Sequence, residues 1–142
     1  KNLEVTLRMS VNKMISGAIL DNKVALYKNS NIKRNFLYID DLINAILMSL
    51  SIKKWDASKY LIGDDIHYSF DNIFTILKNI ENKIVKEKNT IQLDKFEMRN
   101  YKISVEKFKS ETKWEVKSSF QENIVNTYED ILLNYGNQNL DF

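Results

Sequence analysis

The sequence predicts a single small domain of the mixed α/β class. Its 142 residues match the usual size of one domain, and 44% of them are hydrophobic, which is enough to fill a core. Short β-prone runs alternate with segments of helical spacing, a pattern typical of α/β and α+β proteins. No proline- or serine-rich linker divides the chain, so we expect residues 1–142 to form one unit.

The first forty residues contain three strand patterns and one helical pattern. Period-2 alternation and short β-branched or aromatic runs indicate strands, whereas apolar residues three and four apart indicate a helix. The predicted elements are strands at 3–7, 24–27 and 36–39 and a helix at 11–18. A polar turn at 28–31 separates the last two strands.

Residues 42–49 predict a helix with one almost wholly apolar face, which consists of Leu42, Ala45, Ile46 and Ser49. Either Asp40 or Asp41 can cap it, because a carboxylate there accepts hydrogen bonds from the free N–H groups of the first turn. An almost wholly apolar face is normally covered by other parts of the protein. We therefore expect this helix to be deeply buried.

Two later helices carry start signals. Ser69 precedes an apolar stripe from Phe70 to Ile84, and Ser118-x-x-Gln121 matches a capping box before the last helix, which Gly136 ends. The apolar face of the last helix consists of Phe120, Ile124, Tyr128, Ile131 and Tyr135. Weaker patterns complete this half of the chain: a strand at 60–62 that ends at Gly63, a strand at 90–93, and a helix from Ser104 through Phe108 toward Trp114.

Composition excludes several kinds of chemistry. Without cysteine the chain forms no disulfide or thiolate metal site, and the single histidine, His67, excludes a two-histidine metal site. The three glycines lie dozens of residues apart, so no glycine-rich loop can cradle a phosphate. We interpret His67 as a solvated loop residue, and the pairs Asp40–Asp41 and Asp64–Asp65 as caps and turn formers rather than catalytic or cation-binding groups.

Charge and hydropathy argue against two large classes of partner. The net charge of +2 is too small to indicate nucleic acid. The longest apolar run, residues 42–50, is far shorter than the roughly 20 residues needed to cross a bilayer. We expect no nucleic-acid or membrane partner, and a chain without cysteine fits the reducing cytoplasm.

Arginine is the informative cation in this lysine-rich chain. Only Arg8, Arg34 and Arg99 occur among the 21 Lys and Arg residues. Where lysine supplies solubility, an isolated arginine often makes a specific bidentate contact with a carboxylate or a phosphate. We therefore single out Arg34 and Arg99, although a surface salt bridge explains each of them equally well on this argument alone.

A series of short motifs occurs in a fixed order. Tyr27 precedes Arg34 by seven positions, and after Arg34 the chain reads Asn-Phe-Leu-Tyr-Ile-Asp-Asp41. The later motifs are Tyr60-Leu-Ile-Gly63, Arg99, Ser104-x-x-Lys107, Trp114 and Ser118-Ser-Phe-Gln-Glu-Asn-Ile. From residue 23 to about 133 this series resembles the second half of the extended short-chain dehydrogenases/reductases, which are NAD-dependent nucleotide-sugar epimerases and dehydratases.

The resemblance implies a fold and a role. The chain would be the small mixed α/β substrate-binding lobe of such an enzyme, with the Rossmann core largely absent and residues 1–10 as the last strand region of the missing N-terminal dinucleotide-binding domain. Arg34 and Arg99 would bind the diphosphate of a nucleotide-diphosphate sugar, and Tyr27 would lie against the nucleotide. The intact enzyme would be a homodimer that uses NAD or NADP for hydride transfer at a sugar carbon, in carbohydrate biosynthesis.

The departures from the family pattern limit what this chain does. No tyrosine is followed four positions later by lysine, so the family's catalytic pair is missing, and the glycine-rich dinucleotide turn is missing as well. We expect no catalysis and no NAD(P) binding by this chain alone, and we expect it to be a fragment of an epimerase (isomerase), a dehydratase (lyase) or a reductase. The alternative is a stand-alone, non-catalytic α/β binding module that uses the surface around Tyr27 and Arg34.

Overall fold

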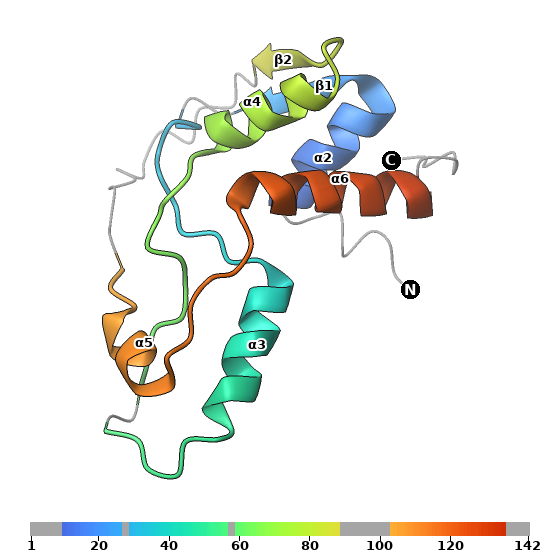
Figure 1. Ribbon diagram of the computed structural model, residues 1–142. Helices are drawn as coiled ribbons and strands as arrows, with labels where there is room; N and C mark the ends of the chain where they lie inside the picture. Colours follow the sequence, from blue (N-terminus) through green and yellow to red (C-terminus); the bar gives the residue numbers. More distant parts are fainter. Residues whose placement is uncertain (1–9, 27–28, 57–58, 89–102, 136–142) are drawn as a thin grey trace.

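The computed structural model describes residues 10–26, 29–56, 59–88 and 103–135. The elements in these ranges are, in chain order, α2 (Ser10–Asp21), β1 (Lys23–Leu26), α3 (Ile39–Ser49), α4 (Phe70–Ile80), β2 (Val85–Lys88), α5 (Glu106–Thr112) and α6 (Phe120–Tyr135). Figure 1 shows α2, α4, α6 and both strands at one end of the molecule and α3 with α5 at the other. Extended segments join the two groups.

The two strands form a parallel sheet. Their register runs from the pair Lys23–Val85 to the pair Leu26–Lys88. Parallel strands need a crossover between them, and α4 lies in that crossover. The predicted strand at 24–27 is confirmed as far as Leu26, and β2 is an element that the sequence did not predict.

A tight turn joins α2 to β1. Asn22 adopts a φ of 54°, in the left-handed region that asparagine tolerates better than most residues. Gly17 of α2 lies against the same turn, where a Cβ would be only 2.7 Å from the carbonyl oxygen of Lys23. The close approach of helix and strand therefore requires glycine at this position, and the predicted helix at 11–18 is confirmed.

The larger core lies between the sheet and helices α2, α4 and α6. Each helix turns one apolar stripe toward the others, as its spacing of apolar residues predicts. The buried side chains of this core are Met14, Ile15, Ala18, Val24, Leu26, Ile73, Leu77, Ile84, Ile124, Tyr128 and Ile131. The predicted face of α4 is confirmed from Phe70 to Ile80 and that of α6 from Phe120 to Ile131, but α4 ends at Ile80, four residues before the end of its predicted apolar stripe.

A second, smaller core holds α3 and α5 together. Its buried side chains are Ala45, Phe108 and Trp114, with Trp55 and Tyr60 packed against them. Helix α5 begins at Glu106 and ends before Trp114, because Lys113 adopts a left-handed φ of 60° and closes the helix. The predicted helix from Ser104 is thus present in shortened form.

Asp41 connects this small core to the start of α6. Its carboxylate accepts hydrogen bonds from the Lys117 backbone N–H at 3.0 Å and from the Ser118 hydroxyl at 2.7 Å. Its backbone carbonyl accepts a third from the indole N–H of Trp114 at 3.1 Å. Asp41 is only 4% exposed, so these bonds offset the cost of burying its charge.

The expected N-terminal caps of α3 and α6 are wrong by one or more residues. Tyr38 occupies the N-cap of α3 without a side-chain hydrogen bond, because Asp41 turns inward to the contacts just described. Ser119 and Glu122 form the reciprocal hydrogen bonds at the start of α6, where Ser118 and Gln121 were predicted to form a capping box. Ser118 instead donates to Asp41.

The expected strands at 36–39 and 60–62 are also wrong. These extended segments pass between the two groups of elements, and in this part of the described chain only a single antiparallel bridge forms, between Arg34 and Tyr68. Their aromatic residues pack in the interior rather than on a sheet: Phe36 lies against Phe70, and Tyr60 against Trp55. The predicted strands at 3–7 and 90–93 and the Gly136 helix end lie outside the described residues.

The prediction that the helix at 42–49 is deeply buried is wrong, because most apolar residues of α3 are exposed. Asp41 and Ala45 are its buried residues, whereas Ile39, Ile43, Ile46, Leu47 and Leu50 are between 47% and 77% exposed. None of the helices in the described ranges is long and apolar enough to cross a membrane.

We predict that Asp41→Ala lowers the free energy of unfolding by about 1.5–3 kcal/mol, because it removes the charged acceptor of two part-buried hydrogen bonds. Asp40→Ala is the matched control, since this neighbouring carboxylate is exposed and its loss should change stability by no more than about 0.5 kcal/mol. Urea unfolding of both variants measures the difference. If Asp41→Ala does not fold, Asp41→Asn takes its place, and equal stability of the variants and their controls would contradict the role of Asp41.

The Tyr128 hydroxyl donates a 2.7 Å hydrogen bond to Glu81, and burial together with this carboxylate raises the pKa of Tyr128 to about 12. Between pH 10 and that value the unfolded chain releases a proton that folded Tyr128 keeps, so stability should fall as the pH rises. We expect the decrease, up to about 1.4 kcal/mol per pH unit, to be smaller in Tyr128→Phe. Unfolding curves of both proteins at pH 9 and 11.5 test this, and identical decreases would contradict it.

Candidate functional site

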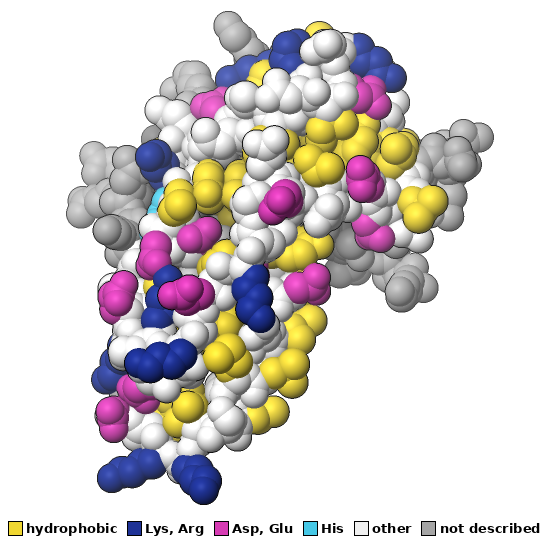
Figure 2. Space-filling view, viewed as in Figure 1, with side chains coloured by type: hydrophobic (Ala, Val, Ile, Leu, Met, Phe, Trp, Pro, Cys, Tyr) yellow, Lys and Arg dark blue, Asp and Glu magenta, His cyan; other side chains and the backbone are white. Residues whose placement is uncertain are grey.

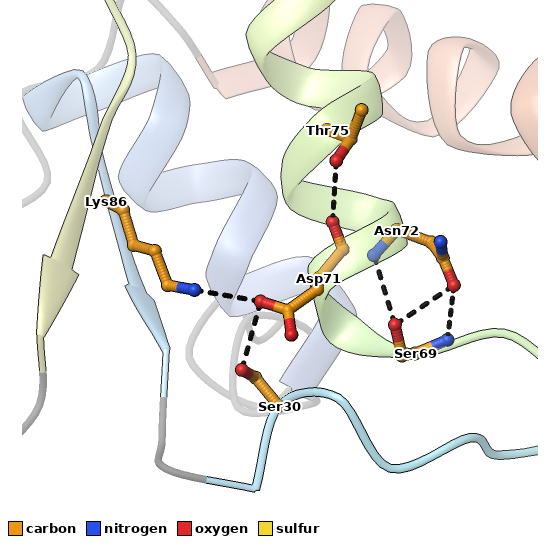
Figure 3. A network of polar contacts seen from close by, with 6 residues as sticks. All are labelled: Ser30, Ser69, Asp71, Asn72, Thr75 and Lys86. Carbon is orange, nitrogen blue, oxygen red and sulfur yellow. Dashed lines mark hydrogen bonds and ion pairs between the residues drawn. The ribbon is translucent and has the colours of Figure 1, made fainter.

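The segment that follows β1 is held against the start of α4. Ser30 is buried, and its hydroxyl donates to the Asp71 carboxylate at 3.0 Å while its carbonyl accepts from the Asp71 backbone N–H at 3.2 Å (Figure 3). The same turn is closed by a hydrogen bond from the Ile32 N–H to the Asn29 carbonyl at 3.1 Å. The polar turn predicted at 28–31 is therefore confirmed from Asn29 onward.

Two further contacts fix the start of α4 itself. Ser69 and Asn72 form a capping box, so the predicted Ser69 cap is confirmed. Lys86 of β2 forms an ion pair with the Asp71 carboxylate at 2.9 Å, the same oxygen to which Ser30 donates (Figure 3). Three parts of the chain thus meet at Asp71: the turn after β1, the first turn of α4, and β2.

Arg34 lies four residues beyond Ser30 and is positioned from both its backbone and its side chain. Its backbone N–H donates to the Tyr68 carbonyl at 2.7 Å, and its carbonyl accepts from the Tyr68 N–H at 3.0 Å. Its guanidinium carbon is 4.8 Å from the centroid of the Phe70 ring. A guanidinium over an aromatic face is attracted by the electron-rich ring, which orients its plane.

The Phe70 ring that contacts Arg34 belongs to a cluster of packed aromatic side chains. Phe70 packs edge-on against Phe36 with ring centroids 5.8 Å apart, and Phe36 contacts Phe120 at 5.6 Å. Tyr68 stacks on Phe120 with centroids 3.8 Å apart and planes at 4°. Burial, and then the nearby carboxylate of Asp64, raise the pKa of Tyr68, so this phenol stays neutral at ordinary pH. We call Ser30, Arg34, Tyr68, Phe70 and Asp71 the Arg34 junction.

An open groove of about 640 Å³ lies next to the junction, between α4 and the start of α6. Tyr68 and Phe120 form part of its wall, and amide side chains such as Asn72 and Asn126 form much of the rest. A smaller hollow of about 190 Å³ lies among α2, α6 and the 36–41 segment. Arg34 is half-buried and is not among the residues that line these two hollows.

The structure places one of the three predicted binding residues, Arg34, at this junction. Tyr27 and Arg99 lie outside the described residues. Neither the contact of the Phe70 ring with Arg34 nor the Ser30–Asp71 contact was predicted from the sequence. The available signal was weak: a serine in the turn and an aromatic residue directly after the Ser69 cap.

The other residues that the sequence offered as candidates, His67, Asp64 and Asp65, each contact a neighbouring group in the structure. His67 is half-buried, with Nδ1 3.4 Å from the Asp65 carbonyl oxygen, so it is less solvated than expected. Asp64 accepts a hydrogen bond from the Ile66 N–H within its turn, and Asp65 forms an ion pair with Lys109. Within the described ranges, no group of three or more His, Cys, Asp or Glu side chains could hold a metal ion.

No family model and no curated protein sequence matches the chain. Solved structures do match it. An NAD-dependent NDP-hexosamine 5,6-dehydratase, TunA, involved in tunicamycin biosynthesis, shares 12% identity at a TM-score of 0.79, over 92% of this chain and 42% of that one. The UDP-glucuronic acid 4-epimerase from Bacillus cereus, in complex with NAD, shares 22% identity at a TM-score of 0.77, over 94% and 41%.

A third match carries a different substrate in its name. L-threonine dehydrogenase from Phytophthora infestans shares 10% identity at a TM-score of 0.75, over 86% of this chain and 40% of that one. The chain thus spans about two fifths of the length of these proteins. At such identities the matches show the fold alone, which is that of the C-terminal part of the short-chain dehydrogenase/reductase structures, as the sequence predicted.

Proposed function

We propose that this chain is the substrate-binding part of an NAD(P)-dependent nucleotide-sugar epimerase, dehydratase or reductase, and that it binds the nucleotide diphosphate of the sugar. The observation that carries the proposal is the Arg34 junction, in a fold shared over nine tenths of the chain with proteins named for NDP- and UDP-sugars. The fold is also compatible with an amino-acid substrate, since L-threonine dehydrogenase shares it. The positioned arginine favours a phosphate-bearing ligand.

The geometry of Arg34 suits a diphosphate. The guanidinium carbon of Arg34 lies over the Phe70 ring, and a guanidinium donates hydrogen bonds in its own plane. Two oxygens of a diphosphate match that planar fork, whereas a lysine ammonium would act only as a point charge. In this proposal Arg99 binds the diphosphate from a second side, and Tyr27 supplies an apolar face for the nucleotide.

The remaining chemistry is assigned to another unit. The chain has neither a Tyr-x-x-x-Lys pair nor a glycine-rich turn, so we propose that a Rossmann-type dinucleotide-binding domain completes the site. NAD or NADP bound there would supply hydride transfer at a sugar carbon. This chain's residues bind and orient the substrate and take no part in proton or hydride transfer. A cytoplasmic location and a homodimeric intact enzyme are parts of the same proposal.

We predict that Arg34→Ala weakens binding of a nucleotide-diphosphate sugar by about 10-fold or more, since a charge-assisted hydrogen bond contributes about 1.5–3 kcal/mol. Saturation-transfer NMR or calorimetry with UDP-glucose, dTDP-glucose and, as a non-phosphate ligand, L-threonine measures this. Lys33→Ala removes an exposed positive charge from the neighbouring residue and is the matched control. Equal affinity of Arg34→Ala and Lys33→Ala for every diphosphate ligand, or binding of L-threonine alone, would exclude the proposed function.

A second prediction concerns the ring beneath the arginine. Phe70→Leu keeps apolar volume in the core but removes the π face that orients Arg34, so binding should weaken about 2- to 5-fold, in line with a cation–π energy of about 0.5–1 kcal/mol. In the Arg34→Ala background the same substitution should have no further effect, because the cation is gone. A double-mutant cycle measures the coupling. Additive losses would mean that Phe70 acts on binding without Arg34.

A further inference from the structure

The smaller hollow, of about 190 Å³ among α2, α6 and the 36–41 segment, combines negative charge with aromatic rings. Of the described residues that line it, two are the carboxylates Asp41 and Asp64, and none is Lys, Arg or His. Its aromatic rings belong to Phe36, Tyr38 and Phe120. Arg34 is not part of this wall, so the hollow is separate from the proposed diphosphate site.

The two carboxylates of the hollow have no cation beside them. Asp41 is 4% exposed, and both groups that donate to its carboxylate, the Lys117 backbone N–H and the Ser118 hydroxyl, are neutral. Asp64 accepts a backbone N–H bond as well, and neither carboxylate forms an ion pair with any of the described residues. Buried charges are normally paired, because an opposite charge offsets the loss of water. A cation held in the hollow would supply that charge.

Asn123 of α6 adds a buried acceptor to the same wall. The Ser118 hydroxyl gives its single proton to Asp41, so its oxygen is left to accept, and it does so from Nδ2 of Asn123 at 2.8 Å. This order of donors fixes Oδ1 at the other end of the Asn123 amide, where none of the described residues donates to it. Because a buried acceptor without a donor is costly, the wall favours a ligand that carries N–H or O–H groups.

The surroundings of Tyr38 show the sign of the charge near the hollow. Burial, and then the carboxylates of Asp40 and Asp130, raise the pKa of Tyr38. Asp40 belongs to α3 and Asp130 to α6. Figure 2 shows acidic side chains, in magenta, along α6 and at the start of α3. Negative charge on two elements raises the local concentration of cations.

We propose that this hollow binds a small organic cation that carries a primary ammonium group. An ammonium has a positive charge for the two carboxylates and three N–H donors, one of which can satisfy Oδ1 of Asn123. The aromatic rings attract a cation and also contact its alkyl part. The hollow is smaller than the roughly 300–1,000 Å³ pockets of drug-sized ligands, so the ligand has only a few heavy atoms.

A metal ion fits the hollow less well than an ammonium. Hard cations such as Ca²⁺ take about six to eight oxygen ligands, and carboxylates supply many of them. Among the described residues no group of three or more His, Cys, Asp or Glu could hold a metal ion. The aromatic part of the wall offers no metal ligand, but it suits an alkylammonium.

Saturation-transfer NMR of the full gene product with propylammonium chloride tests the proposal. We expect saturable binding with a Kd of about 1–10 mM, because so few atoms make contact. 1-Propanol matches propylammonium in size but lacks the charge, and it should bind at least about 10-fold more weakly. Tetramethylammonium has the charge but no N–H donor, and it should also bind at least about 10-fold more weakly.

Two substitutions locate the binding. Asp64→Asn removes one charge but keeps an acceptor for the Ile66 N–H, and it should weaken propylammonium binding about 5-fold or more. Asp65→Asn is the matched control, since this neighbouring carboxylate is not part of the wall and pairs with Lys109. Asn123→Leu removes the unpaired acceptor at nearly the same volume, and it should weaken binding by a similar factor of about 5. If Asn123→Leu does not fold, the comparison of Asp64→Asn with Asp65→Asn decides alone.

Three results would overturn the proposal: no saturable binding of propylammonium, equal binding of 1-propanol, or equal affinity of Asp64→Asn and Asp65→Asn for propylammonium. Equal binding of 1-propanol would mean that the hollow is only an apolar cavity. Equal affinity of the two variants would mean that the cation binds elsewhere on the surface. The inference does not rest on the proposed function, which is tested separately with Arg34→Ala.

Discussion

The arrangement of the two groups of elements depends on Asp41. Its carboxylate and carbonyl together accept hydrogen bonds from Lys117, Ser118 and Trp114, and so connect the first turn of α3 to the chain that enters α6. Without these bonds, Lys117 and Ser118 would lose the acceptor that ties the start of α6 to the small core. The carboxylate also stands in the first turn of α3, where the helix dipole favours a negative charge. One buried charge therefore fixes both the position of α3 and the start of α6.

The Arg34 junction depends on a second set of contacts, which lie where the turn after β1 meets the start of α4. Ser30 and Lys86 both contact one carboxylate oxygen of Asp71. The antiparallel bridge between Arg34 and Tyr68 follows Ser30 along one segment and precedes Asp71 along the other. The backbone of Arg34 is paired on both its N–H and its carbonyl, so the position of its Cα is fixed, and the Phe70 ring then attracts its guanidinium. A guanidinium held in this way loses less conformational entropy when it binds a diphosphate than a free surface lysine would.

Local sequence predicted the helices well because their apolar spacing is regular, and it failed where tertiary partners decide. The stretch Ser118-Ser119-Phe120-Gln121-Glu122 contains two overlapping capping boxes, and Asp41 selects the second by taking the Ser118 hydroxyl. Strand β2 has a single apolar residue in Val85-Lys-Glu-Lys, so its pairing with β1, rather than its own pattern, makes it a strand. Arg34 could be singled out by its rarity, but the Phe70 ring beneath it follows only from the bridge to Tyr68.

The wrong prediction that α3 is deeply buried has a different cause. Its sequence predicts a covered helix, and the structure covers one side of it only. The exposed Leu132 and Leu133 of α6 show the contrast, since they are an isolated pair on a helix whose remaining exposed residues are mostly polar, and single apolar residues of this kind need no partner. On α3 the apolar positions continue through three turns. An apolar surface of that length is normally covered, so the pattern in the sequence predicts a burial that the described residues alone do not supply.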